Sequence, residues 1–288
     1  MKRIIPALLL CAVLLLSGCK TFGVMSFETY DGSGGYTAAA GTVKLEGVTS
    51  INIDWIYGSV RIEESDVSAV TFSEVSTADG KTDALGQIQK DSELTESLRM
   101  RYILSDGELT VKYCKSGLRV RYGAVADLKK DLTVYVPSGT SLERVTVNSV
   151  SSDIYMYGIE ADTADVNGVS SAGIKIVDCK IKDLSAYAVS GNIELDCKET
   201  PEKTDVGAVS GQIKLSLPSV TDLKCSATAG DVTLELESAD FSLTATGIHP
   251  LYVTGFEYSE KDSVYTFGSG SGSAEINCIS GKVRIVSK

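Results

Sequence analysis

The sequence predicts an all-β protein built as a β-solenoid, a β-helix-like repeat array with about 19–20 residues per rung. A short motif recurs through the C-terminal half, its copies follow one another at a nearly constant interval, and apolar and polar residues alternate within each copy. Alternation is typical of a strand with one buried face, because successive side chains of a strand point to opposite sides. Rungs of this length bury their apolar faces against one another, and nothing in the pattern favours helix.

The chain opens with the layout of a secretory signal peptide. Lys2 and Arg3 precede an apolar run over residues 4–16, which small residues then close. A transmembrane helix needs roughly 20 apolar residues, so this shorter run favours cleavage over retention in the membrane. We therefore expect the chain to be exported.

Leu16-Ser17-Gly18-Cys19 resembles a lipobox. The resemblance implies that the Cys19 thiol receives a diacylglyceryl group and that residues 1–18 are removed. The lipid would anchor the protein to the cell envelope, on the outer face of the cytoplasmic membrane or on the outer membrane. Lys20 is not the acidic residue that would suggest retention at the inner membrane. The alternative is an ordinary signal peptide followed by a chance cysteine.

Residues 19–41 are rich in glycine, serine and alanine and predict a flexible tether, with the β-solenoid domain over 42–288. Removal of residues 1–18 takes away two basic residues and moves the formal charge from −11 to −13. Such a surface repels nucleic acid and anionic lipid headgroups, so we expect no nucleic-acid partner. No later apolar stretch approaches the length of a membrane span.

The front half of the domain carries weaker strand signals. Residues 51–55 alternate, and residues 57–62 echo the later motif. Residues 77–98 are polar and predict a long excursion. Strands resume over 109–113 and 132–137, where Pro137 ends the second because proline cannot donate to a ladder.

The repeat itself begins near residue 145. Its branched apolar anchors are Ile154, Ile174, Ile193, Ile213 and Val232, separated by 20, 19, 20 and 19 residues, and the last copy centres on Val283, 51 residues further on. That interval equals about two turns plus a dozen residues, and residues 268–273, Gly-Ser-Gly-Ser-Gly-Ser, predict an insertion loop there. The Ser-Gly before most strands predicts a corner rather than a phosphate loop, which would need a following helix.

Stacking places equivalent positions of neighbouring rungs about 4.8 Å apart. Lys175, Glu194 and Lys214 are therefore expected to form an outward row of alternating charge. Asp178 and Asp196 are expected to stack in the same way.

Five cysteines remain after export and lipidation: Cys114, Cys179, Cys197, Cys225 and Cys278. An odd number cannot all pair within one chain, and with no CxxC and a single histidine we expect no metal site. Cys179 and Cys197 match at a separation of 18, which places them on neighbouring rungs within the reach of a disulfide. A disulfide and two separate buried thiols both remain open.

Asp131-Leu-Thr-Val-Tyr-Val-Pro-Ser-Gly139, followed by the recurrent Val-Ser-Gly-x-Ile-x-Leu rungs, resembles the bacterial putative-adhesin domain family, also called the toast-rack β-solenoid. The resemblance covers roughly residues 42–288 and carries no catalytic motif. It implies a right-handed array on exported or membrane-attached proteins, sometimes linked to envelope-stress systems of the phage-shock type.

Little material for catalysis is present. His249 is the sole histidine and precedes Pro250, which predicts a turn residue rather than a member of a triad. The aspartates of the repeat are dispersed, and Tyr155, Tyr157 and Tyr187 do not recur at the rung period. We therefore expect no enzyme and no cofactor, with glycan lyase or hydrolase activity as a remote alternative.

Two classes of function fit the sequence better. The first is a noncatalytic surface module that presents its solenoid to a protein or glycan partner. The second is an envelope-stress sensor reporting to a membrane protein.

Overall fold

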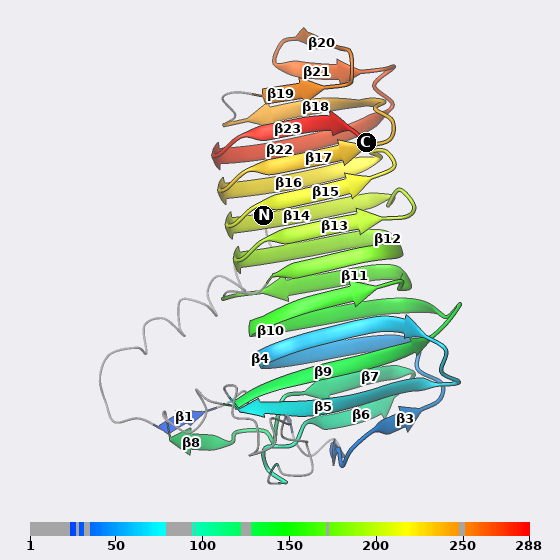
Figure 1. The fold of residues 1–288 in the computed structure, drawn as a ribbon, viewed down its shortest axis with the longest axis vertical. Coiled ribbons are helices and arrows are strands. Elements are labelled where there is room, and N and C mark those ends of the chain that lie inside the picture. Colours follow the sequence, from blue (N-terminus) through cyan, green and yellow to red (C-terminus); the bar gives the residue numbers. More distant parts are fainter. Residues whose placement is uncertain are drawn as a thin grey trace, which may run out of the picture.

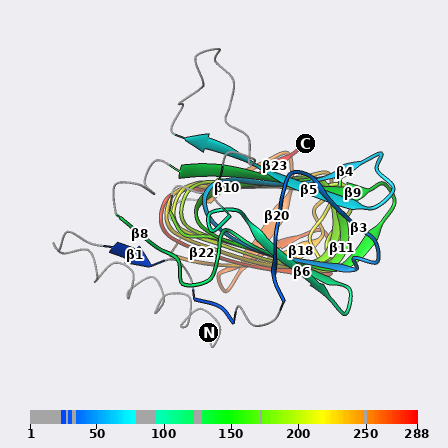
Figure 2. The same cartoon turned by 90° about the horizontal axis from the view of Figure 1, so that it is seen from below.

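The computed structural model describes residues 24–26, 29–31, 35–78, 94, 96–121, 128–170, 173–247 and 251–288. All regular secondary structure in this part of the chain is β-strand, and 21 of the strands join one continuous sheet. Figures 1 and 2 show that the sheet winds into a flattened tube with two broad faces and two narrow edges. The predicted all-β solenoid is confirmed. Over the described residues we find no helix of the length and hydropathy that crossing a membrane requires.

We call the broad faces A and B, and neighbouring strands within the stack on each face run parallel. From the lower end of Figure 1, face A contains β7 (Glu108–Lys112), the first half of β4 (Ser50–Ser65), the first half of β10 (Ser141–Tyr157), β11 (Glu160–Gly168), the second half of β12 (Ile174–Ser190), β14 (Lys203–Ser210), β16 (Asp222–Ala229), β22 (Gly272–Ser280) and β18 (Phe241–Thr246). Face B contains β9 (Leu128–Pro137), the second halves of β4 and β10, the first half of β12, β13 (Ile193–Cys197), β15 (Ile213–Leu217), β17 (Val232–Leu236), β23 (Val283–Ser287) and β19 (Leu251–Thr254).

The repeat read from the sequence sets the register of face B. The anchors pair in an unbroken ladder, and each is at most 1% exposed: Ile154, Ile174, Ile193, Ile213, Val232 and Val283. Burial of one such side chain stabilises the fold by about 1.5–3 kcal/mol, so the ladder forms the centre of the core.

The 51-residue interval between Val232 and Val283 has a different basis from the predicted insertion loop. These two residues lie directly opposite one another, because β22 and β23 are inserted between the rung of β16 and β17 and the rung of β18 and β19. The chain first builds the outermost rung and then a hairpin of β20 (Tyr258–Lys261) and β21 (Val264–Phe267), before it returns into the stack. The last rung in the sequence is thus internal.

The lower end repeats this arrangement. β4, the first rung of the sequence, lies between β10 on one side and β7 and β9 on the other. Antiparallel strands then cover the end: β2 (Thr37–Ala38), β3 (Val43–Leu45), β5 (Val70–Ala78) and β6 (Arg101–Ser105). We call this assembly the lower cap, and it reduces the open strand edge that would invite pairing with another chain.

Part of the predicted tether belongs to the lower cap, because β2 lies within it and pairs with β6. β1 (Val24–Ser26) pairs with β8 (Arg119–Arg121) in a separate two-stranded sheet, and Ala39 is buried. The Tyr30 hydroxyl donates to the Cys114 carbonyl at 2.8 Å. The described residues of 19–41 therefore contact the domain, because aromatic and small apolar side chains within the segment find partners there. Gly32, Ser33 and Gly34 lie outside the described residues.

Glycines form a ladder along the edge where the A strands end and the B strands begin, which we call the A-to-B edge. A Cβ on Gly211 would lie 2.0 Å from the Gly191 carbonyl oxygen, and one on Gly230 would lie 1.9 Å from that of Gly211. Gly281 repeats the contact against Gly230 at 2.0 Å. Since no side chain fits at these distances, the corner role predicted for the Ser-Gly motif is confirmed.

Candidate functional site

The outward positions of face B carry the predicted row of charge. Lys175, Glu194 and Lys214 lie in register on successive rungs. The ammonium of Lys175 is 3.0 Å from the Glu194 carboxylate, and this hydrogen bond raises the pKa of Lys175. Lys214 instead pairs with Glu235 at 3.0 Å, on the next rung. These side chains are largely exposed, so each pair contributes at most about 1 kcal/mol to stability.

Below this row on face B, two tyrosines and an arginine form a patch that we call the tyrosine patch. The rings of Tyr155 and Tyr157 are parallel within 7°, with centroids 6.3 Å apart. The Arg61 guanidinium lies 5.3 Å from the first centroid and 5.0 Å from the second, and it pairs with Glu63 at 3.2 Å. Partial burial, and then the charge of Asp153, raise the pKa of Tyr155. The patch therefore offers aromatic surface beside a hydrogen-bond donor and an acceptor.

Tyr187 lies on face A, so the three tyrosines considered in the sequence do not share one surface. Its ring occupies the space above Gly207, where a Cβ would come within 2.7 Å of the ring. Burial, followed by a hydrogen bond with Asp205, raises the pKa of Tyr187. This tyrosine packs within the face rather than extending the tyrosine patch.

Several of the dispersed aspartates have structural partners. Asp153 accepts a hydrogen bond from the Gly173 amide at 2.9 Å, one rung above it. Asp231 accepts one from the Lys282 amide at 2.9 Å and pairs with Arg284 at 2.8 Å. Hydrogen bonds from Arg284 and then from the Lys282 amide lower the pKa of Asp231. Both carboxylates hold one corner to the next, a role that the sequence did not reveal.

The predicted stacking of Asp178 on Asp196 is wrong. Asp196 pairs with Val177, because Asp178 is an extra residue in a bulge and adopts a positive φ of 59°. The bulge then restores the pairing one position later, at Cys179 and Cys197. A single inserted residue therefore explains why the cysteines match at a separation of 18 while the anchors Ile174 and Ile193 on the same two strands are 19 apart.

A shallow pocket of about 200 Å³ lies on the opposite narrow edge, where the B strands end and the A strands begin. We call this the B-to-A edge. Its lining includes Glu64, Asp178, Lys180 and Lys198. Lys180 pairs with Glu199 at 2.7 Å, and Lys198 lies 4.0 Å from Asp178. Both lysines of the pocket are thus engaged in ion pairs, Lys180 with a residue outside the lining.

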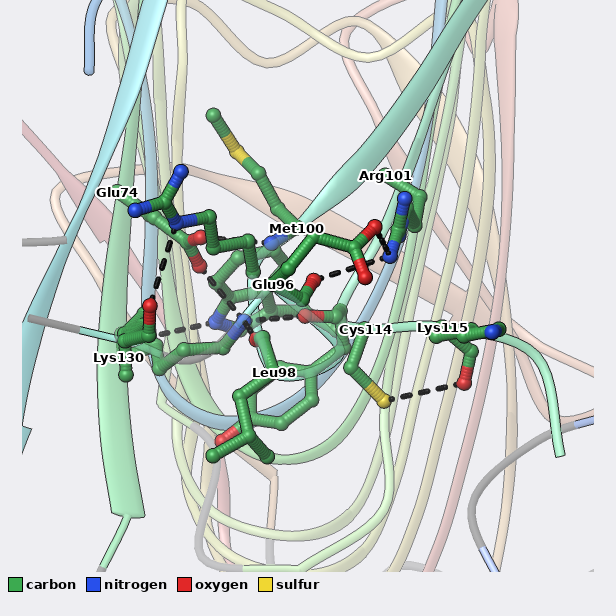
Figure 3. Close-up of polar contacts among 12 residues, drawn as sticks. Glu74, Glu96, Leu98, Met100, Arg101, Cys114, Lys115 and Lys130 are labelled. Atoms are coloured by element: carbon green, nitrogen blue, oxygen red, sulfur yellow. Dashed lines mark hydrogen bonds and ion pairs between the residues drawn. The ribbon is translucent and has the colours of Figure 1, made fainter. Parts of the chain in front are cut away.

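The most deeply buried charges are Glu74 of β5, in the lower cap, and Lys130 of the neighbouring β9, and Figure 3 shows their polar contacts. The Lys130 ammonium is 2.6 Å from the Glu74 carboxylate, and both side chains are 0% exposed. Lys130 also donates to the Leu98 carbonyl at 2.8 Å and to the Tyr113 carbonyl, while Glu74 accepts from the Met100 amide at 2.6 Å.

Aromatic rings complete the surroundings of this ion pair. The Lys130 ammonium lies 4.1 Å from the Tyr113 ring centroid and 5.0 Å from that of Trp55. Burial lowers the pKa of Lys130, although the Glu74 charge opposes this effect. The ion pair joins β5 and β9, and solvent does not reach either charge. No motif in the sequence pointed to it.

Residues 158–248 match the sequence model of the family described as Toastrack DUF4097. The chain contains a Toastrack domain. The matched segment begins just before β11 and extends just past β18, so it covers most of the regular repeat. No curated protein matches the sequence.

Solved structures similar to the chain share little sequence with it. A putative adhesin from Bacteroides fragilis is 11% identical, with a TM-score of 0.44 over 88% of this chain and 98% of its own. A putative lipid binding protein from Parabacteroides distasonis is 14% identical, with a TM-score of 0.39 over 91% and 100%. A putative cell adhesion protein from Clostridium sporogenes is 12% identical, with a TM-score of 0.35 over 88% and 100%.

Within the Toastrack domain, Cys179 and Cys197 lie opposite one another on β12 and β13. Both are buried free thiols in this structure, and a disulfide between them stays a prediction. Burial raises the pKa of Cys179 to about 11 and that of Cys197 to about 12. Raised pKa values suppress the thiolate form, so the sulfurs act as small apolar side chains.

Two residues singled out in the sequence, Cys19 and His249, lie outside the described residues. Among the residues that the structure does describe, no three His, Cys, Asp or Glu side chains form a group suited to a metal ion.

Proposed function

We propose that this protein is a lipid-anchored, noncatalytic interaction module of the cell envelope, and that the tyrosine patch on face B contacts its ligand. The Toastrack fold supports the first part, because a rigid stack of rungs presents extended faces suited to binding. The observation that carries the second part is the pair of parallel, half-buried rings of Tyr155 and Tyr157 beside the Arg61 guanidinium.

A glycan is the ligand class that this arrangement favours. A sugar ring combines an apolar C–H face with a rim of hydroxyl groups. Aromatic side chains bury large apolar area, and Arg61 and Glu63 provide a donor and an acceptor at the rim. The net formal charge of the chain is negative, which favours neutral or basic glycans over acidic ones.

Binding to a glycan array tests the assignment. We expect the Tyr155→Ala/Tyr157→Ala variant to bind its best glycan at least about tenfold more weakly than the wild type. Tyr252→Ala is the matched control, because Tyr252 is an exposed tyrosine further along the same face and it should bind as the wild type does. Equal binding by all three proteins contradicts the assignment. Capture of an envelope protein that depends on the tyrosine patch would make the ligand a protein.

Anchoring at Cys19 has a separate test. We expect the wild-type chain to incorporate radiolabelled palmitate in cells and to partition into the detergent phase of Triton X-114. Cys19→Ala should lose the label, whereas Cys114→Ala should keep it. Label that persists in Cys19→Ala would contradict the anchor without affecting the proposed ligand surface.

A further inference from the structure

An aliphatic ridge runs along the A-to-B edge, at the left of the stack in Figure 1 where β14, β16 and β22 end. It consists of the residue that precedes each corner motif, which is valine or isoleucine on five rungs and threonine on one. The register places its members on successive rungs: Val150, Val169, Val189, Val209, Thr228 and Ile279. Val189 is 38% exposed, Val209 45% and Ile279 65%. Nearly all other branched aliphatic side chains of the repeat are buried, so this exposure is specific to the edge.

The strips on both sides of the ridge are uncharged. One outward row consists of Asn148, Asn167, Tyr187, Gly207, Ser226 and Asn277. The other consists of Ser151, Ser170, Ser190, Ser210, Ala229 and Ser280. Charged residues make up 23% of the chain, yet none stands in the ridge or in these two rows. Depletion of charge around exposed apolar residues is typical of the centre of a protein interface.

The two narrow edges differ sharply in this respect. Lys180, Glu199, Lys198 and Asp178 form ion pairs along the B-to-A edge. If exposed valines were simply what a corner of this fold requires, the second edge would show them too. Beyond the uncharged row on face A, the next outward row contains charged residues such as Asp165 and Asp205. This arrangement matches a protein interface, which has an apolar centre and a polar rim.

We propose that the ridge is a self-association surface, which packs against the ridge of a second copy of this chain. Ridge residues repeat at the rung spacing of about 4.8 Å, and only a partner with the same spacing can interdigitate with them along the whole edge. A second copy of the chain has that spacing because it contains the same rungs. Two copies that each carry a formal charge of −13 after removal of residues 1–18 repel one another over most of their surface, and the uncharged edge is where that repulsion is weakest. This inference does not depend on the tyrosine patch.

Multi-angle light scattering of the purified full chain in mild detergent, corrected for the detergent, measures the association. We expect the wild type to have twice the mass of one chain at about 100 µM. Val189→Glu/Val209→Glu should raise the dissociation constant at least about tenfold. Val189→Thr/Val209→Thr keeps the branched side chains, so it should fold normally and also weaken association. Thr244→Glu/Ser273→Glu adds the same charge on exposed positions of face A and should remain dimeric.

A photo-crosslinking amino acid in place of Val189 extends the test to intact cells. The expected product is a band of twice the chain mass, which disappears when Val209→Glu is added, while the same probe at Lys224 gives no such band. A wild-type chain that is monomeric at about 100 µM overturns the proposal, as does equal association by the ridge variants. Loss of binding to phosphatidylethanolamine and phosphatidylglycerol vesicles in the ridge variants of a monomeric protein would assign the edge to a lipid surface instead.

Discussion

Replacement of Gly211 by alanine should strongly destabilise the stack at one defined corner. The new Cβ would lie 2.0 Å from the Gly191 carbonyl oxygen and 2.6 Å from its carbon, and the residue has a φ of +146°. To reach an acceptable contact near 3 Å, the two rungs must separate locally by about 1 Å. That movement stretches the neighbouring hydrogen bonds from Gly191 to Ser210 and from Ile193 to Gln212, which are 3.0 and 2.9 Å long.

Two weakened hydrogen bonds cost about 1 kcal/mol each. The unfavourable backbone conformation adds about 1–2 kcal/mol. We therefore expect a loss of about 3–4 kcal/mol at this corner. Gly139→Ala separates the two causes, because Gly139 has a φ of +75° but no atom within 4 Å of its would-be Cβ. Its replacement should cost only about 1 kcal/mol.

Hydrogen exchange followed by mass spectrometry is the appropriate assay, since solenoids can unfold rung by rung rather than as one unit. Trp55 is the only tryptophan and lies near the lower cap, so its fluorescence reports on a different part of the stack. Exchange in peptides spanning residues 191–213 should accelerate in Gly211→Ala and stay unchanged in Gly139→Ala. If Gly211→Ala is no less stable than Gly139→Ala, the corner at Gly211 tolerates a side chain, and the argument from the close approach of neighbouring corners is refuted.

Three further predictions concern buried or unusually ionised groups. Lys130→Met leaves the Glu74 carboxylate buried without its cation and should lower the free energy of unfolding by about 3–5 kcal/mol. Chemical denaturation followed by Trp55 fluorescence measures this loss, and adding Glu74→Gln should recover part of it. Hydrogen bonds from Ser271 and Ser269 lower the pKa of Asp240 to about 2, so its stabilising effect is complete above its ordinary value of 3.8 and is lost as the pH falls towards 2. The protection factors of the amides of residues 268–271, which correct for the pH dependence of intrinsic exchange, should therefore fall over that pH range, and Asp240→Ala should show low protection at every pH. Native Cys179 and Cys197 should react slowly with iodoacetamide at pH 8 and rapidly after denaturation, and non-reducing mass spectrometry distinguishes this outcome from a disulfide, which would block both thiols even in the denatured chain.

The Gly-Ser segment at 268–271 has a partner that its composition does not reveal. Asp240 accepts hydrogen bonds from the Ser269 amide at 2.6 Å and the Gly270 amide at 2.8 Å. Small residues allow successive backbone amides to surround one carboxylate oxygen. The partner lies about 30 residues away in the sequence, so no local pattern identifies it.

For the tyrosine patch, the sequence supplied the residues but not their relation. Tyr155 and Tyr157 share a face because they are two residues apart on one strand, which alternation predicts. Arg61 joins them only because β4 pairs with β10, although β5, β6, β7, β8 and β9 all lie between these two strands in the sequence. The same limit applies to Lys130 and Glu74, which strand pairing between β5 and β9 brings together.

The sequence by itself determined the strands, their inward and outward positions, the rung interval and the glycine corners, because each depends on side-chain alternation or on contacts repeated at one spacing. Only the tertiary structure decided the order of the rungs at the two ends. Every rung presents a similar apolar face and a similar strand edge, so local pattern does not specify which rung lies next to which. The insertion of β22 and β23 beneath β18 and β19, and of β4 above the lower cap, depends on how whole rungs and caps fit together.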